Sequence, residues 1–141
     1  MIHAWFDGDL NVPALPDWLV PYFEGVQNFV AETGFEPVAW EQAIYEPIHR
    51  YAGKYDVRGK MRGQRLPALV DFKSGEIGKW TRVQLAAYTC GKPHARVAVG
   101  LGAGLSGGKN YECEVYGIDT LAKHLQVFHA SLIIARFHSG G

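Results

Sequence analysis

An acid and a base lie two residues apart in the segment ALVDFKSG, which runs from Ala68 to Gly75. Side chains at positions i and i+2 of a strand point to the same face, so we expect Asp71 and Lys73 to lie side by side at the edge of a core. Such a pair is either an ion pair that closes a strand or half of an active site.

A second acid precedes this pair. Asp56 ends the segment GKYD, and a hairpin between adjacent strands would bring its carboxylate close to that of Asp71. Like charges at that distance repel unless a divalent cation lies between them. Oxygen ligands without a Cys or His cluster favour a hard cation, Mg²⁺ or Mn²⁺. Each acid alone is most simply a surface charge, and the joint pattern is what indicates a metal site.

Glu41 and Lys73 could complete this chemistry. Glu41 follows Trp40 in an apolar context, so it needs a partner and could join the metal ligands. The alternative is a solvated glutamate on a strand face. Glu46 is the competing acid, but Pro47 follows it and favours a turn. Lys73 cannot bind a cation while protonated, but beside a metal it could hold a water or help to deprotonate it.

Two neutral polar residues, Gln84 and Tyr88, are spaced four apart in a segment expected to be helical. This spacing places them on one helix face. They could form the hydrated edge of the helix, or they could reach toward the metal site and a scissile phosphate.

The glycine-rich segment GAGLSG, residues 102–107, matches the dinucleotide-binding pattern G-x-G-x-x-G. That pattern requires a helix next, whereas the following segment KNYECEVYG is typical of a strand. We therefore expect a hairpin loop, with at most a minor phosphate contact from Lys109.

Hydrophobic periodicity predicts the elements that must position these side chains. Helices are expected at about 17–34 and 82–90 and from Asp119 or Thr120 onward. Strands are expected at 38–45, 51–58, 66–73, 95–101 and 111–118, with GKMRGQR as the hairpin loop between the second and the third. The predicted order α-β-β-β-α-β-β-α describes an α/β (α+β) domain with a mixed central sheet of about five strands flanked by helices.

The composition narrows the class of protein. The chain has 141 residues, enough for one domain with its own core, and we expect a single domain over residues 1–141. Its 14 basic and 14 acidic residues cancel, so global charge gives no signal for nucleic acid or membrane. No apolar run approaches the roughly 18 residues of a membrane span, and the N-terminal segment lacks signal-peptide features. Two cysteines are too few for a disulfide framework or an iron–sulfur cluster, which predicts a reduced, cytoplasmic setting.

The combination of Glu41, GKYD, VDFK and QLAAY resembles the PD-(D/E)XK nuclease superfamily, in its RecB-like branch. That branch includes lambda-type phage exonucleases and CRISPR-associated iron–sulfur nucleases. Its layout is a glutamate, G-x-x-D, (D/E)-x-K and Q-x-x-x-Y, and all four occur here in order. The resemblance covers about residues 38–91 and implies a restriction-endonuclease-like core. The four cysteines of the iron–sulfur subgroup are absent, so no iron–sulfur cluster is expected.

The N-terminus resembles the family in part. Members of this branch often carry a metal-binding histidine on an upstream helix, and Ile2-His3-Ala4 resembles the end of that element, which implies His3 as a further metal ligand. The preceding helices of the family have no counterpart in the sequence. The chain is therefore expected to be either a minimal version or a part of a longer reading frame.

The resemblance implies metal-assisted hydrolysis of a phosphodiester bond, with one or two Mg²⁺ or Mn²⁺ ions. The implied ligands are the side chains of Asp56, Asp71 and Glu41 and the backbone carbonyl of Phe72. Lys73 would position the attacking water and offset charge in the transition state. Gln84 and Tyr88 would orient the phosphate or the lysine.

Basic and aromatic residues near these motifs could bind the nucleic acid. They are Arg58, Lys60, Arg62, Arg65, Lys79, Trp80 and Arg82. The alternative is a solvated loop whose charges serve solubility.

We therefore expect a Mg²⁺- or Mn²⁺-dependent deoxyribonuclease, in the first instance an exonuclease of phage or bacterial DNA recombination, repair or replication. Its partner would be single- or double-stranded DNA with a free end, and no membrane. Association with further copies, or with a recombination or replication protein, is left open. Two alternatives remain: a non-cleaving DNA- or protein-binding module of the same fold, and a structure-specific endonuclease.

Overall fold

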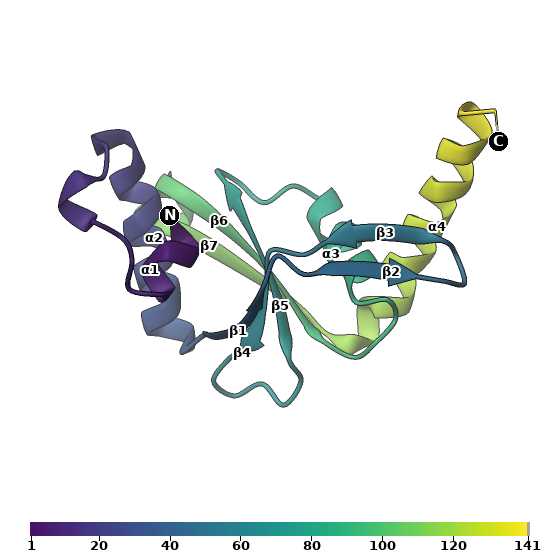
Figure 1. Cartoon of the computed structure of the whole chain (residues 1–141), viewed down its shortest axis with the longest axis horizontal. Coiled ribbons are helices and arrows are strands. Elements are labelled where there is room, and N and C mark those ends of the chain that lie inside the picture. The colour runs from purple at the N-terminus through teal and green to yellow at the C-terminus, as the bar shows by residue number, and fades with distance from the viewer. Residues whose placement is uncertain (141) are drawn as a thin grey trace.

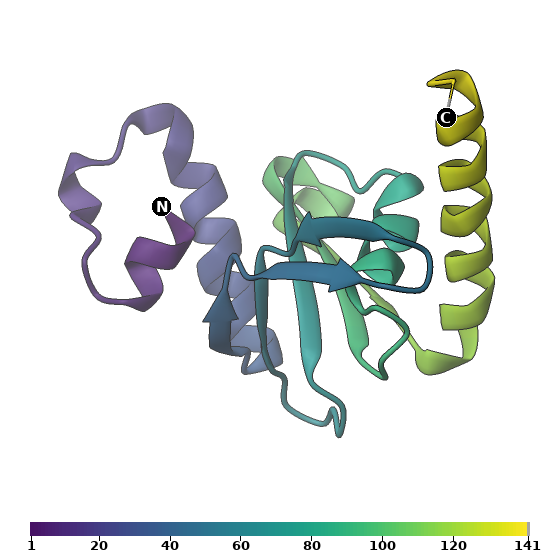
Figure 2. The ribbon, with the colours of Figure 1, turned by 45° about the vertical axis from the view of Figure 1, so that its right-hand side comes forward.

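The computed structural model describes residues 1–140 as an α+β fold around a five-stranded mixed sheet (Figures 1 and 2). The strand order is β1-β4-β5-β6-β7, and only β5 and β6 pair in parallel. The sheet strands are β1 (Glu36–Trp40), β4 (Val57–Lys60), β5 (Ala68–Ser74), β6 (Ala95–Leu105) and β7 (Lys109–Tyr116). The helices are α1 (Ile2–Phe6), α2 (Val20–Thr33), α3 (Trp80–Tyr88) and α4 (Leu121–His138).

A second, two-stranded sheet consists of β2 (Ala43–Glu46) and β3 (Tyr51–Lys54). The strands expected at 38–45 and 51–58 are thus each divided in two. The division falls at Glu41, whose φ of 46° takes the backbone out of the extended region. The hairpin nevertheless continues across the bend, since Glu41 N donates to Asp56 O at 2.8 Å and Tyr55 N donates to Gln42 O at 3.2 Å. Figure 2 shows the resulting β2–β3 ribbon crossing in front of α3.

The alternating side chains of β5 divide the core into two layers. Val70 belongs to the larger apolar cluster, with Val26 and Phe29 of α2, and the ring of Phe72 meets Phe29 edge-on. Leu69 belongs to the smaller cluster, with Leu85 of α3. Asp71 and Lys73 alternate in phase with Leu69, so both lie on the α3 side of the sheet.

Helix α3 lies in the connection between β5 and β6. Parallel neighbours need such a crossover, because a tight turn cannot reverse the chain between them. The register Asp71↔Ala98 places the end of β5 over the middle of β6, and α3 packs across both strands. This arrangement carries the helix residues Gln84 and Tyr88 to the face that holds Asp71.

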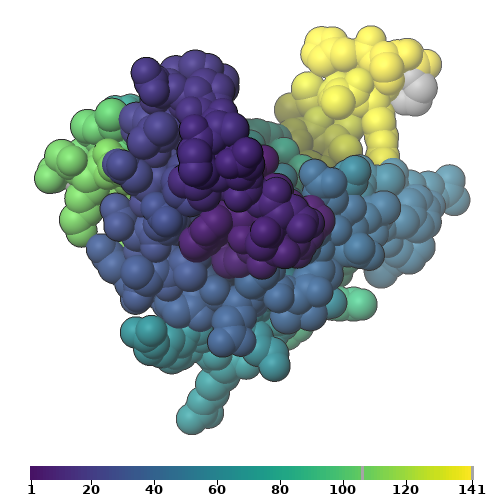
Figure 3. Space-filling model, turned by 60° about the vertical axis from the view of Figure 1, so that its left-hand side comes forward, coloured from purple at the N-terminus to yellow at the C-terminus, as the bar shows by residue number. Residues whose placement is uncertain are grey.

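Helix α4 packs against α3, and its last turns project from the body of the protein (Figures 1 and 3). Its base is fixed by Arg96 of β6, whose exposed fraction is 0%. The Arg96 guanidinium donates to Gly117 O at 3.0 Å, to Thr120 Oγ1 at 2.8 Å and to His124 Nδ1 at 2.8 Å. Within residues 1–140, no helix is long and apolar enough to span a membrane.

Candidate active site

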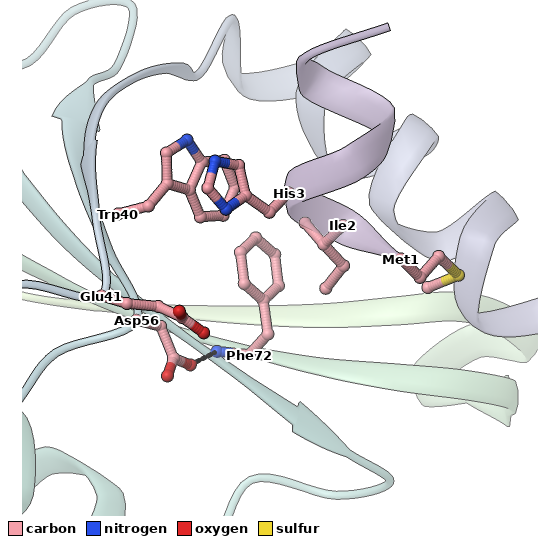
Figure 4. Close-up of a pocket in the computed structure, with 7 residues that line it drawn as sticks. All are labelled: Met1, Ile2, His3, Trp40, Glu41, Asp56 and Phe72. Carbon is pink, nitrogen blue, oxygen red and sulfur yellow. Dashed lines mark hydrogen bonds between the residues drawn. The ribbon is translucent and has the colours of Figure 1, made fainter. Parts of the chain in front are cut away.

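Asp56 lies where β4 separates from β5. The β4–β5 ladder ends at the pair Val57↔Val70, so the backbone of Phe72 has no partner on β4. The Asp56 carboxylate takes that place, because its Oδ2 accepts the Phe72 N–H at 3.1 Å (Figure 4). A strand residue directs its N–H and its C=O to the same side. The Phe72 carbonyl therefore points toward the edge at which Asp56 stands.

Four side chains from β5 and α3 form one connected polar network. Lys73 Nζ lies 3.1 Å from Asp71 Oδ2 and donates to Gln84 Oε1 at 3.3 Å. Gln84 Nε2 in turn donates to the Tyr88 hydroxyl at 2.8 Å. Because that hydroxyl oxygen accepts from Gln84, its own hydrogen stays available for another acceptor. The sequence spacings i,i+2 on the strand and i,i+4 on the helix thus meet across the interface between β5 and α3.

The electrostatics of this network centre on Asp71, of which 5% is exposed. Burial and the neighbouring Asp56 carboxylate raise the pKa of Asp71 from 3.8 to about 6, although Lys73 opposes the shift. Its Oδ2 is buried and accepts no hydrogen bond within residues 1–140. Its contact with Lys73 is therefore an ion pair only. Burial and the charge of Asp71 also raise the pKa of Tyr88. The site holds two acids close together with one cation, which leaves negative charge uncompensated.

Glu41 shares a surface pocket with Asp56, Phe72 and the N-terminal residues (Figure 4). Glu41 is solvent-exposed, and its side chain lies beside Asp56 in that view. His3, the other implied ligand, also lines the pocket but is engaged elsewhere. Its ring stacks on Trp40 with centroids 4.3 Å apart, and its Nε2 pairs with Asp7 at 3.1 Å. The structure therefore brings Glu41 to the acids and holds His3 against Trp40.

Without rearrangement, these residues supply only part of the ligand set that a hard cation requires. Asp56, Asp71 and the Phe72 carbonyl can supply oxygen ligands, and the buried Oδ2 of Asp71 accepts no hydrogen bond within residues 1–140, although it forms an ion pair with Lys73. Within residues 1–140, however, no three His, Cys, Asp or Glu side chains converge into a ready metal site. Two carboxylates are preformed, and a third ligand must come from Glu41 or from the backbone.

The expected nucleic-acid-binding residues divide into separate regions. Lys60, Arg62 and Arg65 belong to the β4–β5 hairpin, near the N-terminal end of β5, whereas Lys79 and Trp80 follow its C-terminal end. Five of the seven are exposed: Lys60, Arg62, Arg65, Lys79 and Trp80. Arg58 and Arg82 are half-buried, and the Arg82 guanidinium lies 5.5 Å from the ring centroid of Tyr116. The expected nucleic-acid-binding residues thus fall in two regions, one toward each end of β5.

Two further residues support the site. Gly53 lies so close to Tyr88 that a Cβ at that position would come within 3.0 Å of the tyrosine ring. Glu112 of β7 accepts the Ile77 N–H at 3.0 Å and so fixes the loop that follows β5. Gly53 is the glycine of the GKYD motif, whereas nothing in the sequence near Glu112 marks its role, because Ile77 lies in a distant segment.

No protein-family model matches this sequence, and no curated protein matches it either. The geometry and chemistry of the site therefore carry the functional argument.

Proposed function

We propose that this protein is a Mg²⁺- or Mn²⁺-dependent DNA nuclease whose fold is the restriction-endonuclease-like core of the PD-(D/E)XK superfamily. One observation carries the proposal. Asp56, Asp71, Lys73, Gln84 and Tyr88 come from three separate segments, and they meet at the edge where β4 leaves β5. A mixed sheet with a β5–α3–β6 crossover provides the scaffold that this class of site requires.

The residues fit a divalent cation for electrostatic reasons. Asp56 and Asp71 would hold it, together with the Phe72 carbonyl and Glu41. When bound, the cation supplies positive charge that neutralises phosphate oxygens and makes a water more acidic. The pKa of Asp71 is raised although Lys73 forms an ion pair with it, and a bound cation would supply the positive charge that the single lysine does not.

Lys73 would act on the attacking water and on the phosphate. An ammonium group has three N–H donors, and Gln84 accepts only one of them. The remaining donors can hold a water or a non-bridging phosphate oxygen, and the positive charge offsets the charge that develops in the transition state. Asp71 keeps the ammonium at the strand edge through the 3.1 Å ion pair.

Gln84 and Tyr88 would orient the lysine. The Gln84 side chain accepts from Lys73 and donates to Tyr88, so its amide can adopt only one orientation in this network. The free hydroxyl hydrogen of Tyr88 can then reach a substrate oxygen. Such positioning restricts the lysine to a narrow set of geometries, which is a large part of what an active site contributes.

DNA cleavage in the presence of Mg²⁺ or Mn²⁺ tests the proposal. We expect end-labelled linear DNA to be degraded, and we expect Asp71→Asn and Lys73→Ala to lower the rate by about 100-fold or more. Asp9→Asn and Lys123→Ala are matched controls, because both residues are exposed and lie outside the site. Full activity in the Asp71 and Lys73 variants would refute the assignment. Closed circular DNA separates the two modes, since an exonuclease leaves it intact and an endonuclease cuts it.

The non-cleaving module of the same fold is favoured by one observation, namely that no three ligating side chains converge within residues 1–140. Calorimetry with Mn²⁺ distinguishes the two. A nuclease binds the ion and loses affinity in Asp71→Asn, whereas a binding module takes up DNA without taking up the metal.

A further inference from the structure

A small pocket lies on the α3 side of the sheet, beneath the β2–β3 ribbon. It has a volume of about 120 Å³ and lies between β4, the C-terminal end of α3 and the start of β6. The residues that line it are Ile44, Tyr55, Arg58, Leu69, Tyr88, Thr89, Cys90, Lys92 and His94. Tyr88 is the only one of these that also belongs to the candidate active site. The volume is about four times that of one water and well below the roughly 300 Å³ of a cofactor pocket.

Three basic side chains, and among the described residues no Asp or Glu, line this pocket. Arg58 projects from β4 opposite Leu69 and is half-buried. His94 is 9% exposed, and its Nδ1 lies 3.0 Å from Lys92 O. A carbonyl can only accept, so Nδ1 carries the hydrogen and Nε2 is left for another partner. Within residues 1–140, no carboxylate lies within ion-pair distance of Arg58 or Lys92.

These cations are not needed to cap α3. The carbonyls at the end of the helix already have donors: Ala86 O accepts Thr89 Oγ1 at 2.7 Å, and Ala87 O accepts the Tyr51 hydroxyl at 2.7 Å. Thr89 O accepts the Lys92 N–H at 3.0 Å. Burial, together with Arg58 and Lys92, lowers the pKa of His94, which indicates that the two cations lie close to the imidazole.

We propose that the pocket formed by Arg58, Lys92 and His94 binds a phosphate group. A guanidinium matches two phosphate oxygens with parallel N–H donors, and an ammonium contributes a mobile point charge. His94 Nε2 can accept from a P–OH group, or donate once it is protonated. Tyr55 lines the pocket, and its hydroxyl forms no hydrogen bond within residues 1–140, so it is a further neutral donor. The choice of phosphate over a carboxylate rests on the proposed nuclease function.

Titration calorimetry of the metal-free protein with inorganic phosphate tests the site. We expect Arg58→Gln and Lys92→Gln each to weaken phosphate binding by at least about 10-fold. Lys54→Gln and Lys123→Gln are matched controls, since both lysines are exposed and do not line the pocket, and they should bind as the wild type does. Lys92 is exposed, so its variant keeps the fold and remains decisive if Arg58→Gln is unstable. Absence of phosphate binding, or equal binding by all four variants, would overturn the proposal. Acetate that binds as tightly as phosphate would overturn the choice of ligand.

Oligonucleotides in the presence of a chelator identify the source of the phosphate. If a terminally phosphorylated strand binds more tightly than its hydroxyl counterpart, and Lys92→Gln abolishes the difference, the ligand is a nucleic-acid end. If both strands bind equally while free phosphate still binds, the ligand is a free phosphate ion. A preference for the phosphorylated strand that persists in both pocket variants contradicts the site. None of these measurements requires cleavage, so loss of the nuclease assignment and loss of the phosphate site are separate results.

Discussion

The Asp56 carboxylate accepts the Phe72 N–H at 3.1 Å, at the point where the backbone ladder between β4 and β5 stops. A side chain thus replaces one rung of the sheet. The same bond holds an acid of the candidate site against the backbone of its neighbour, so the geometry of the site and the end of the ladder depend on each other.

The raised pKa of Asp71 predicts an unusual pH dependence of stability in the metal-free protein. An acid whose folded-state pKa lies above its unfolded value favours folding when protonated, so its contribution declines as pH rises from about 4 to about 6. We expect the free energy of unfolding to lose about 2–3 kcal/mol from this group over that range. Urea unfolding of wild type and Asp71→Asn at several pH values isolates the effect as a difference. A constant difference between the two proteins across this range would contradict the pKa shift.

His124 should produce the opposite trend. Arg96 can only donate, so His124 Nδ1 must accept and the imidazole must be neutral. Burial, followed by Arg96, Arg82 and Lys123, lowers the pKa of His124 in the folded state. The unfolded chain therefore takes up the proton first, and stability is lost as pH falls below about 6.5. The protection factors of the α4 amides, which correct for the intrinsic pH dependence of exchange, should fall at pH 5.5 in the wild type and not in His124→Gln, which can still accept from Arg96. Equal pH dependence in both proteins would contradict this account.

Gly53 should be less tolerant of a methyl group than Gly78. A Cβ at Gly53 would meet the Tyr88 ring at 3.0 Å, whereas a Cβ at Gly78 meets nothing within 4 Å. We expect Gly53→Ala to displace the ring, weaken its bond to Gln84 and cost about 1–2 kcal/mol of unfolding free energy. Nuclease activity should fall in parallel, and Gly78→Ala should match the wild type in both measurements. If Gly53→Ala and Gly78→Ala were equally stable, the β2–β3 ribbon would have to move to accommodate the added methyl group.

Glu41 should tolerate glycine better than Glu36 does. Glu41 has a φ of 46°, in the region where glycine has no steric cost, and Glu36 lies in the extended strand β1. Both residues are exposed. We expect Glu41→Gly to keep its unfolding free energy within about 0.5 kcal/mol of wild type, and Glu36→Gly to lose about 1 kcal/mol. Mn²⁺ affinity should show the reverse order, with the larger loss in Glu41→Gly. A large loss of stability in Glu41→Gly would mean that its side chain supports the bend.

Short-range spacing predicted the local parts of the site, because strand and helix periods determine which side chains share a face. Asp71 and Lys73 stand together as i and i+2 on β5, and Gln84 and Tyr88 stand together as i and i+4 on α3. A mixed sheet of about five strands was also predictable, since β5 and β6 carry apolar, β-branched runs. β4 has no such run, and half of it, Gly59 and Lys60, was expected to lie in the hairpin loop.

Other features depended on contacts between distant segments. Nothing in the sequence near Glu41 marks a positive φ, so the two long strands could not be divided in advance. Arginine is usually a surface residue, so the sequence does not predict that Arg96 is buried. Its burial depends on acceptors on α3, η4 (Ile118–Thr120) and α4, which only the folded chain brings together.

Because the chain bends at Glu41, the pairing register of the β2–β3 ribbon is independent of the pairing register of the main sheet. Pairing between Val57 and Val70 fixes β4 on one side of the bend, and pairing between Ala43 and Lys54 fixes the ribbon on the other. Residues added or removed in pairs at the ribbon tip, between Glu46 and Tyr51, would therefore leave Asp56 opposite Phe72. The contacts that such a change would disturb are those between the tip and α4, where Arg136 donates to His49 O and to Arg50 O.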